Sequence, residues 1–232
     1  MTYLLVLLAA CSFFGDARTG KKAADTAAPT RASSRPSAKD DEPAAPPKGK
    51  TPLMLPGTRS GPGEPEVKVT ADQCNQIEDG GPVKMNGCIT DRIECGQSIV
   101  GHTRGGVNLL NTRWYEKNYC WPATEQKDGG DERIYAFSFP DDGAHVARFT
   151  MDSPCADLDI AVFTWDKQTC PTGKEEGLFE CEMKREKGTK RESVEAVTDG
   201  GRLKDWLVVV EGVRDEEGPF SITVQCGDGV HW

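Results

Sequence analysis

Carboxylates are the side chains in this sequence whose spacing comes closest to a metal chemistry. Asp157 and Asp159 lie two residues apart at the start of an apolar run, so in a strand both carboxylates would point to the same face. Asp128 and Asp131 lie in a Gly-rich stretch that could meet them. Clustered carboxylates suit Ca²⁺, so these four residues form a candidate calcium site. The alternative, which we favour, is that they cap turns by accepting hydrogen bonds from backbone N–H groups.

Aromatic rings form a second candidate site. Four of them fall within eight positions, in a polar stretch that follows an expected strand: Trp114, Tyr115, Tyr119 and Trp121. Exposed rings could make a flat platform for sugar rings or for a partner protein. Alternatively, the rings cover the open end of the β-structure and are fixed there by Cys120. Trp165 and Trp206 fall within expected strands, and we expect both in the core.

Catalytic motifs are missing. The sequence has no G-x-S-x-G, H-E-x-x-H, P-loop or G-x-G-x-x-G motif. Its histidines, His102, His145 and His231, stand at unrelated places. From Thr70 onward 18 Lys and Arg residues face 30 Asp and Glu residues, whereas up to Val69 the counts are 10 and 7. An acidic domain lacks the cationic face that nucleic acids need. We therefore predict a protein that is not an enzyme and has no nucleic-acid partner.

The elements that must position these residues read as short strands separated by Gly, Pro and Asp turns. Phe220, Ile222, Val224 and Cys226 share one face of the last strand. The run 207–210 is apolar throughout, as in a central strand covered on both faces. We expect strands at 93–101, 106–113, 133–139, 144–151, 158–165, 178–183, 192–197, 206–213 and 220–226. Such a set predicts an all-β antiparallel sandwich of jelly-roll type, with about eight or nine strands.

Six short motifs in this order resemble the bacterial pre-peptidase C-terminal (PPC) domain. They are Cys95-Gly96, residues 131–137, residues 156–163, the Cys170…Cys181 bracket, residues 207–212 and residues 218–224. The resemblance spans roughly residues 93 to 227, so we assign 93–232 to a PPC-like domain and 70–92 to a small cysteine-closed extension. It implies a jelly-roll sandwich that acts as a secreted, non-catalytic accessory module.

The nine cysteines divide into Cys11 and eight others, which are Cys74, Cys88, Cys95, Cys120, Cys155, Cys170, Cys181 and Cys226. No C-x-x-C occurs, so four disulfides in an oxidising compartment fit better than zinc. Cys170 and Cys181 bracket a short loop, and we pair them. Cys95 and Cys226 share the buried parity of the first and last strands, which a jelly roll can bring together. The remaining cysteines would then pair as Cys74–Cys88 and Cys120–Cys155, the second by elimination.

The N-terminal region carries a targeting signal. Residues 4–10 are an apolar run too short to span a bilayer but suited to a signal peptide. The run ends in Leu8-Ala9-Ala10-Cys11, which resembles the lipobox of bacterial lipoproteins and implies that Cys11 is acylated after residues 1–10 are removed. Ser12 then implies sorting to the outer membrane. Nine of the 15 prolines lie between Pro29 and Pro65, so residues 11–69 are expected to be a disordered tether.

Two classes of function remain after these exclusions. The first is a membrane-tethered envelope protein whose sandwich binds a protein or glycan partner, in the periplasm or at the cell surface. The second is a structural or accessory subunit, either of an envelope complex or of a separately encoded secreted hydrolase. Apart from the candidate calcium ion, no cofactor is expected.

Lipid anchoring through Cys11 has a direct test in intact-protein mass spectrometry. The mature protein should lack residues 1–10 and carry added acyl mass, because the lipobox cysteine becomes the acylated first residue. Cys11→Ala should stay unprocessed or appear in the soluble fraction. A wild-type protein that fractionates as soluble with an unmodified Cys11 would contradict the lipoprotein interpretation.

Overall fold

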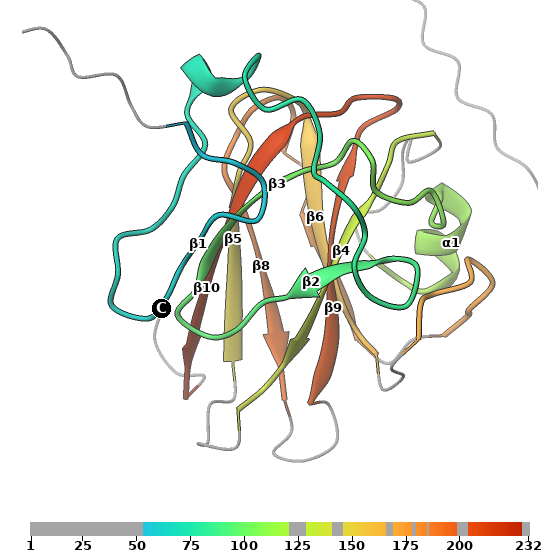
Figure 1. Cartoon of the computed structure of the whole chain (residues 1–232). Helices are drawn as coiled ribbons and strands as arrows, with labels where there is room; N and C mark the ends of the chain where they lie inside the picture. Colours follow the sequence, from blue (N-terminus) through green and yellow to red (C-terminus); the bar gives the residue numbers. More distant parts are fainter. Residues whose placement is uncertain are drawn as a thin grey trace, which may run out of the picture. The chain divides into compact units, whose positions relative to one another are not determined.

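Two five-stranded sheets pack face to face in the computed structural model (Figure 1). The structure describes residues 53–120, 129–140, 146–165, 169–177, 180–184, 186–198 and 204–228. One sheet, here sheet A, has the order β1-β3-β10-β5-β8, and the other, sheet B, has the order β2-β4-β9-β6-β7. Strand β2 runs parallel to β4, and every other pairing is antiparallel. The all-β sandwich predicted from the sequence is confirmed.

Eight of these ten strands overlap the ranges predicted from the sequence, and β1 and β2 were not predicted. Sheet A consists of β1 (Arg59–Ser60), β3 (Ser98–His102), β10 (Pro219–Gly227), β5 (Val146–Asp152) and β8 (Glu192–Val197). Sheet B consists of β2 (Ile89–Arg92), β4 (Arg133–Ser138), β9 (Asp205–Gly212), β6 (Leu158–Thr164) and β7 (Cys181–Lys184). The two helical segments are η1 (Ala71–Gln73) and α1 (Thr112–Lys117). Neither of them is long and apolar enough to cross a membrane.

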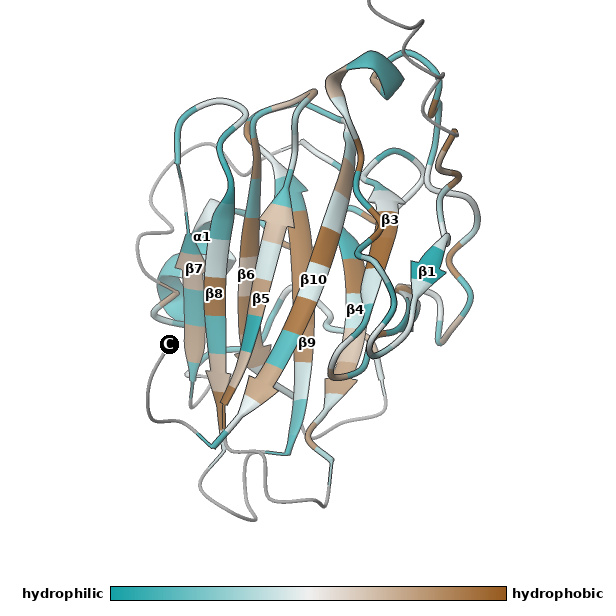
Figure 2. Ribbon diagram, turned by 90° about the vertical axis from the view of Figure 1, so that its left-hand side faces the viewer, coloured by the Kyte–Doolittle hydropathy of each residue, from teal (hydrophilic) through white to brown (hydrophobic). Residues whose placement is uncertain are grey.

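The core between the sheets forms largely from alternate residues of β4, β5, β6, β8, β9 and β10. Phe220, Ile222 and Val224 of β10 are fully buried there. Hydrophobic residues recur along β10 in Figure 2, as its side chains alternate between the two faces of sheet A. Across the core, Tyr135 and Phe137 of β4 face inward, and each is 1% exposed.

The outer face of sheet A is polar. Arg148 of β5 stands opposite Glu195 of β8, and its Nε and Nη2 donate to Glu195 Oε1 at 2.9 and 2.6 Å. The hydroxyls of Thr150 and Ser193, opposite each other on the same strands, lie 3.0 Å apart. Such cross-strand polar pairs are typical of a sheet face turned to solvent.

Sheet B, by contrast, is apolar on both faces. In β9, Trp206, Val208 and Val210 belong to the core between the sheets, while Leu207 and Val209 belong to a second core on the outer face. The second core exists because α1, the turn at residues 85–89 and the loop at residues 169–177 lie over that face. We call these three segments the outer cover. The central position predicted for the run 207–210 is therefore confirmed.

Helix α1 replaces part of a predicted strand. The sequence analysis placed a strand at 106–113, but Asn111 caps a helix there by accepting a hydrogen bond from Trp114 N at 2.9 Å. Tyr119, two residues after the last residue of α1, takes a positive φ of 57°, and the helix does not continue through it. A six-residue helix is too short to show helical periodicity, so the pattern of apolar residues did not reveal it.

The predicted boundaries at 70 and 93 both differ from the structure. Residues 53–69 were assigned to the disordered tether, yet β1 pairs with β3, and Val67 and Val69 pack with Val100 in a third buried cluster. We predicted disorder here from the proline content, although Val67 and Val69 are spaced as the residues on one face of a strand are. Likewise, the predicted extension at 70–92 supplies β2 to sheet B, rather than a separate cysteine-closed loop.

All eight predicted cysteines form disulfides, but only one predicted pairing is correct. Cys95–Cys226 is present with a Cα–Cα distance of 5.5 Å, and it joins the two sheet-A ends that strand parity indicated. The other three pairs are Cys74–Cys155, Cys88–Cys170 and Cys120–Cys181. Our short-loop pairings Cys74–Cys88 and Cys170–Cys181, and Cys120–Cys155, are wrong. Cys181 lies opposite Phe163, on the outer face of sheet B, so it meets Cys120 after α1 rather than its neighbour in sequence.

Removing methyl groups at Val67 and Val69 tests whether residues 53–69 belong to the folded domain. Each Val→Ala change deletes two buried methyl groups, so each should lower the free energy of unfolding by about 1–2 kcal/mol in urea titrations. Leu55→Ala is the control, because Leu55 is 59% exposed and its change should have an effect below about 0.5 kcal/mol. Unchanged stability of V67A and V69A would show that residues 53–69 belong to the disordered tether, as predicted from the sequence.

Candidate functional site

The predicted aromatic platform is mostly buried, which corrects the first of our two interpretations. Trp114 is 1% exposed and Tyr115 is fully buried. Their rings pack edge to face at 5.2 Å, and Trp114 lies 5.1 Å from Phe163 of β6. Among the described members of the set, Tyr119 alone is exposed, at 71%. Trp121 lies outside the described residues. The rings therefore cover the sheet, as in the alternative, and Cys120 fixes them through Cys181.

Polar contacts fix Trp114 in this position. Its indole Nε1 donates to Glu175 Oε2 at 3.1 Å, and Asn118 Nδ2 donates to the Glu175 carbonyl at 3.0 Å. Glu175 Oε1 in turn accepts from the backbone N and hydroxyl of Thr172. These contacts join α1 to the loop 169–177, so the two segments of the outer cover behave as one layer.

The predicted carboxylates bind backbone groups. Asp131 Oδ2 accepts from Gly105 N at 3.0 Å, and Asp157 Oδ1 accepts from Gly188 N at 2.9 Å. Asp159 is buried in β6, and Asp128 lies outside the described residues. Within the described part of the chain, no three His, Cys, Asp or Glu side chains meet in a group that could hold a metal ion. Asp131 and Asp157 thus take the turn-bonding role that we favoured from the sequence.

A buried acidic cluster under α1 escaped the sequence analysis. Tyr115 donates its hydroxyl proton to Glu211 Oε2 at 2.5 Å, and Glu211 lies directly opposite Asp159 on β6. Glu132 accepts hydrogen bonds from Leu109 N and Leu110 N, at 3.0 and 2.8 Å. Burial and the nearby charges of Glu211, Glu132 and Asp159 hold the pKa of Tyr115 well above its usual range. Strand parity could have revealed the burial of Glu132. Glu132 lies two residues before Ile134 and so shares its face of the strand, and Ile134 packs in the second core, on the outer face of sheet B.

Burial also raises the pKa of Glu132, to about 7, although hydrogen bonds from Leu110 and Leu109 act in the opposite direction. His102 shows the reverse case for a base. Burial and the charge of Arg104 lower its pKa to about 4, and its Nδ1 accepts a hydrogen bond from Arg104 N at 3.0 Å. His102 therefore serves as a neutral structural acceptor at neutral pH. His145 and His231 lie outside the described residues.

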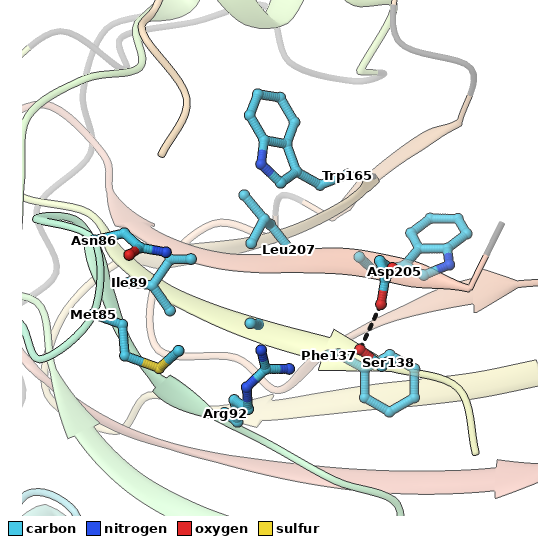
Figure 3. Close-up of a pocket in the computed structure, with 11 residues that line it drawn as sticks. Met85, Asn86, Ile89, Arg92, Phe137, Ser138, Trp165, Asp205 and Leu207 are labelled. Atoms are coloured by element: carbon cyan, nitrogen blue, oxygen red, sulfur yellow. Dashed lines mark hydrogen bonds between the residues drawn. The ribbon is translucent and has the colours of Figure 1, made fainter. Parts of the chain in front are cut away.

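The outer cover leaves a groove where it ends (Figure 3). Met85, Asn86 and Ile89 lie at one end of the groove, and a hydrogen bond of 2.6 Å from the Ser138 hydroxyl to Asp205 lies at the other. Leu207 and Trp165 form one long wall of the groove, and the exposed guanidinium of Arg92 lies between its two ends. The groove measures about 370 Å³, including space open to solvent.

Local chain geometry builds both sides of this groove. Asn86 and Gly87 take positive φ angles of 50° and 82°, which close a tight turn with Met85 and Ile89 hydrogen-bonded across it. Cys88–Cys170 then ties the turn to the loop 169–177. On the other side, Trp165 Nε1 donates to the Thr169 carbonyl at 2.7 Å. The groove thus has an apolar floor, a cation, a carboxylate and a hydroxyl, which is the mixture typical of binding sites for polar ligands.

Comparison with known proteins gives a structural likeness and no family assignment. No family model matches the chain, and no curated protein matches it significantly. Among solved structures, the chain is similar to the pre-peptidase C-terminal domain of collagenase from Bacillus anthracis, with 12% identity and a TM-score of 0.33. The match covers 58% of this chain and 93% of that domain.

The raised pKa of Glu132 predicts a pH dependence of stability. Between about pH 4.5 and 7 the folded state keeps a proton on Glu132 that the unfolded state releases. The free energy of unfolding should therefore fall as the pH rises through this window, by about 3 kcal/mol at most. Glu132→Gln removes the titrating group and should flatten the fall in urea titrations at several pH values.

The matched control is Glu116→Gln, which changes an exposed glutamate on α1. This variant should keep the wild-type slope. An E132Q protein that loses stability between pH 4.5 and 7 as steeply as the wild type would show that Glu132 does not hold the proton.

Proposed function

We propose that this chain is a lipid-anchored outer-membrane protein of the bacterial cell envelope whose sandwich binds a protein or glycan partner through the groove on sheet B. The observation that carries the proposal is the groove itself. In the groove, the apolar side chains of Trp165 and Leu207 lie near the exposed side chains of Arg92 and Asn86. A partner can bury apolar surface there and also find fixed hydrogen-bonding groups.

The disulfides support a role outside the cytoplasm. Four of them occur within the described residues, and such density is typical of oxidising compartments. Anchoring rests on Leu-Ala-Ala-Cys11 in the sequence. The order of motifs shared with the PPC domain supports an accessory role without catalysis.

Rigidity supports binding by a preformed surface. Two disulfides, Cys88–Cys170 and Cys120–Cys181, fix the outer cover around the groove. A site that is held before the partner arrives loses less conformational entropy on binding. The groove walls also come from both the sheet and the cover, so their spacing is set by the fold.

A capture experiment tests the proposal. The full chain carrying Cys11→Ala is immobilised and incubated with envelope extract, and the retained species are identified by mass spectrometry. The double variant Asn86→Ala/Arg92→Ala should lose the retained species, because it removes two exposed polar groups at the groove. Gln225→Ala is the control, since Gln225 is exposed on β10 of sheet A.

Two further arms separate the alternatives. Treating the extract with protease first should abolish capture of a protein partner and leave capture of a glycan intact. Tyr119→Ala tests the exposed remainder of the aromatic set. Retention of the same species by N86A/R92A, with loss only in Y119A, would overturn the groove and place binding at α1.

A further inference from the structure

A second cavity lies at the edge of the sandwich and is lined by other residues of β2 than the groove is. It is bounded by β3 of sheet A, by β2 and β4 of sheet B, and by the segments at residues 56–57 and 80–84. It measures about 420 Å³, including space open to solvent. Pro56, Pro82, Ile99 and Val100 give it apolar walls, and Thr90, Asp91 and Tyr135 give it polar ones.

Two hydroxyl groups line this cavity from the interior. Thr90 is 8% exposed, and its Oγ1 has no hydrogen-bond partner among the described residues. Tyr135 is 1% exposed, and a Cβ added at Gly101 would lie 2.5 Å from its hydroxyl oxygen. Gly101 itself lines the cavity, so the lack of a side chain there leaves the Tyr135 hydroxyl accessible from it. Buried hydroxyls of native proteins have a hydrogen-bond partner in the great majority of cases, so we expect a bound molecule in this cavity.

The charges around the cavity favour an anion. Arg133 is fully buried behind the wall formed by Gly80 and Gly81, and a Cβ at Gly80 would lie 2.5 Å from its Nη2. Its Nε and Nη2 donate only to carbonyl oxygens, those of His102, Gly81 and Arg104. Its Nη1 has no hydrogen-bond partner among the residues that the structure describes. The guanidinium is thus hydrogen-bonded by carbonyl oxygens, and the carboxylates of Asp131 and Asp79 offset only part of its positive charge through longer-range attraction.

The rim adds to this positive potential. Arg59 Nη2 and Lys84 Nζ both approach Asp91 Oδ2, at 3.0 and 2.8 Å, so two cations share one carboxylate there. Burial raises the pKa of Tyr135, the charges of Arg133 and Arg59 lower it, and the charge of Asp91 raises it. The hydroxyl of Tyr135 therefore remains protonated at neutral pH and can donate to an anion.

We propose that this cavity binds a small organic carboxylate, which accepts hydrogen bonds from the Thr90 and Tyr135 hydroxyls while its carbon atoms contact the apolar walls. The carboxylate could belong to a free small acid or to the C-terminus of a polypeptide, since both present the same group. The site goes beyond the groove on sheet B and does not depend on it.

The test is an amide NMR titration of the full oxidised chain carrying Cys11→Ala. N-acetylalanine is the probe for a free acid, a hexapeptide with a free carboxylate is the probe for a C-terminus, and N-acetylalanine amide is the neutral control. We expect saturable shifts at residues 80–101 with at least one carboxylate and none with the amide. The probe that binds more tightly identifies the source.

Thr90→Val and Tyr135→Phe each remove one hydroxyl with little change of shape, and Thr223→Val on β10 is the matched control. Each hydroxyl variant should weaken carboxylate binding by about tenfold, with a melting temperature no lower than that of the wild type, because no protein partner is lost. Absence of saturable shifts in the wild type, equal binding of the neutral amide, or unchanged binding by T90V and Y135F would each overturn the carboxylate site.

Discussion

Sheet B is apolar on both faces, and the rest of the domain follows from the need to keep both faces from water. Strand β9 shows this most clearly, because Val208 packs toward sheet A and Val209 packs toward the outer cover. In sheet A, by contrast, the outer face of β5 and β8 carries an ion pair and hydroxyl groups that can face water. The outer cover forms a third layer over sheet B, and the segment with Val67 and Val69 covers part of sheet A at Val100. The groove lies where the outer cover stops.

The outer cover consists of one short helix, a turn and a loop, which have little secondary structure to hold them. Cys120–Cys181 and Cys88–Cys170 connect these segments to each other and to β7. Beneath them, Tyr115 binds Glu211, and Glu132 binds the chain that leads into α1. These carboxylates satisfy backbone and hydroxyl donors that would otherwise be buried without partners. The cost is a free energy of unfolding that falls as Glu132 ionises.

The sequence predicted the sheets better than the cover, for a physical reason. Strands β8 and β10 bury every second residue, so period-two alternation located them, and strand parity also found Cys95–Cys226. The cover has no period, and its α1 depends on a cap at Asn111 and on contacts with Glu175 that are distant in sequence. Trp114 and Tyr115 therefore looked like exposed rings. For the same reason, the sequence did not single out Glu132 and Glu211.

We propose that a partner binds at the edge of the outer cover and not on the polar face of sheet A. Photocrosslinking tests this most directly. A photoreactive amino acid is placed at Asn86, beside the groove, and in a second protein at Gln225, on the exposed face of sheet A. After exposure to envelope extract, the account predicts a discrete crosslinked species from position 86 and none from position 225. The same species from position 225 alone would contradict the account.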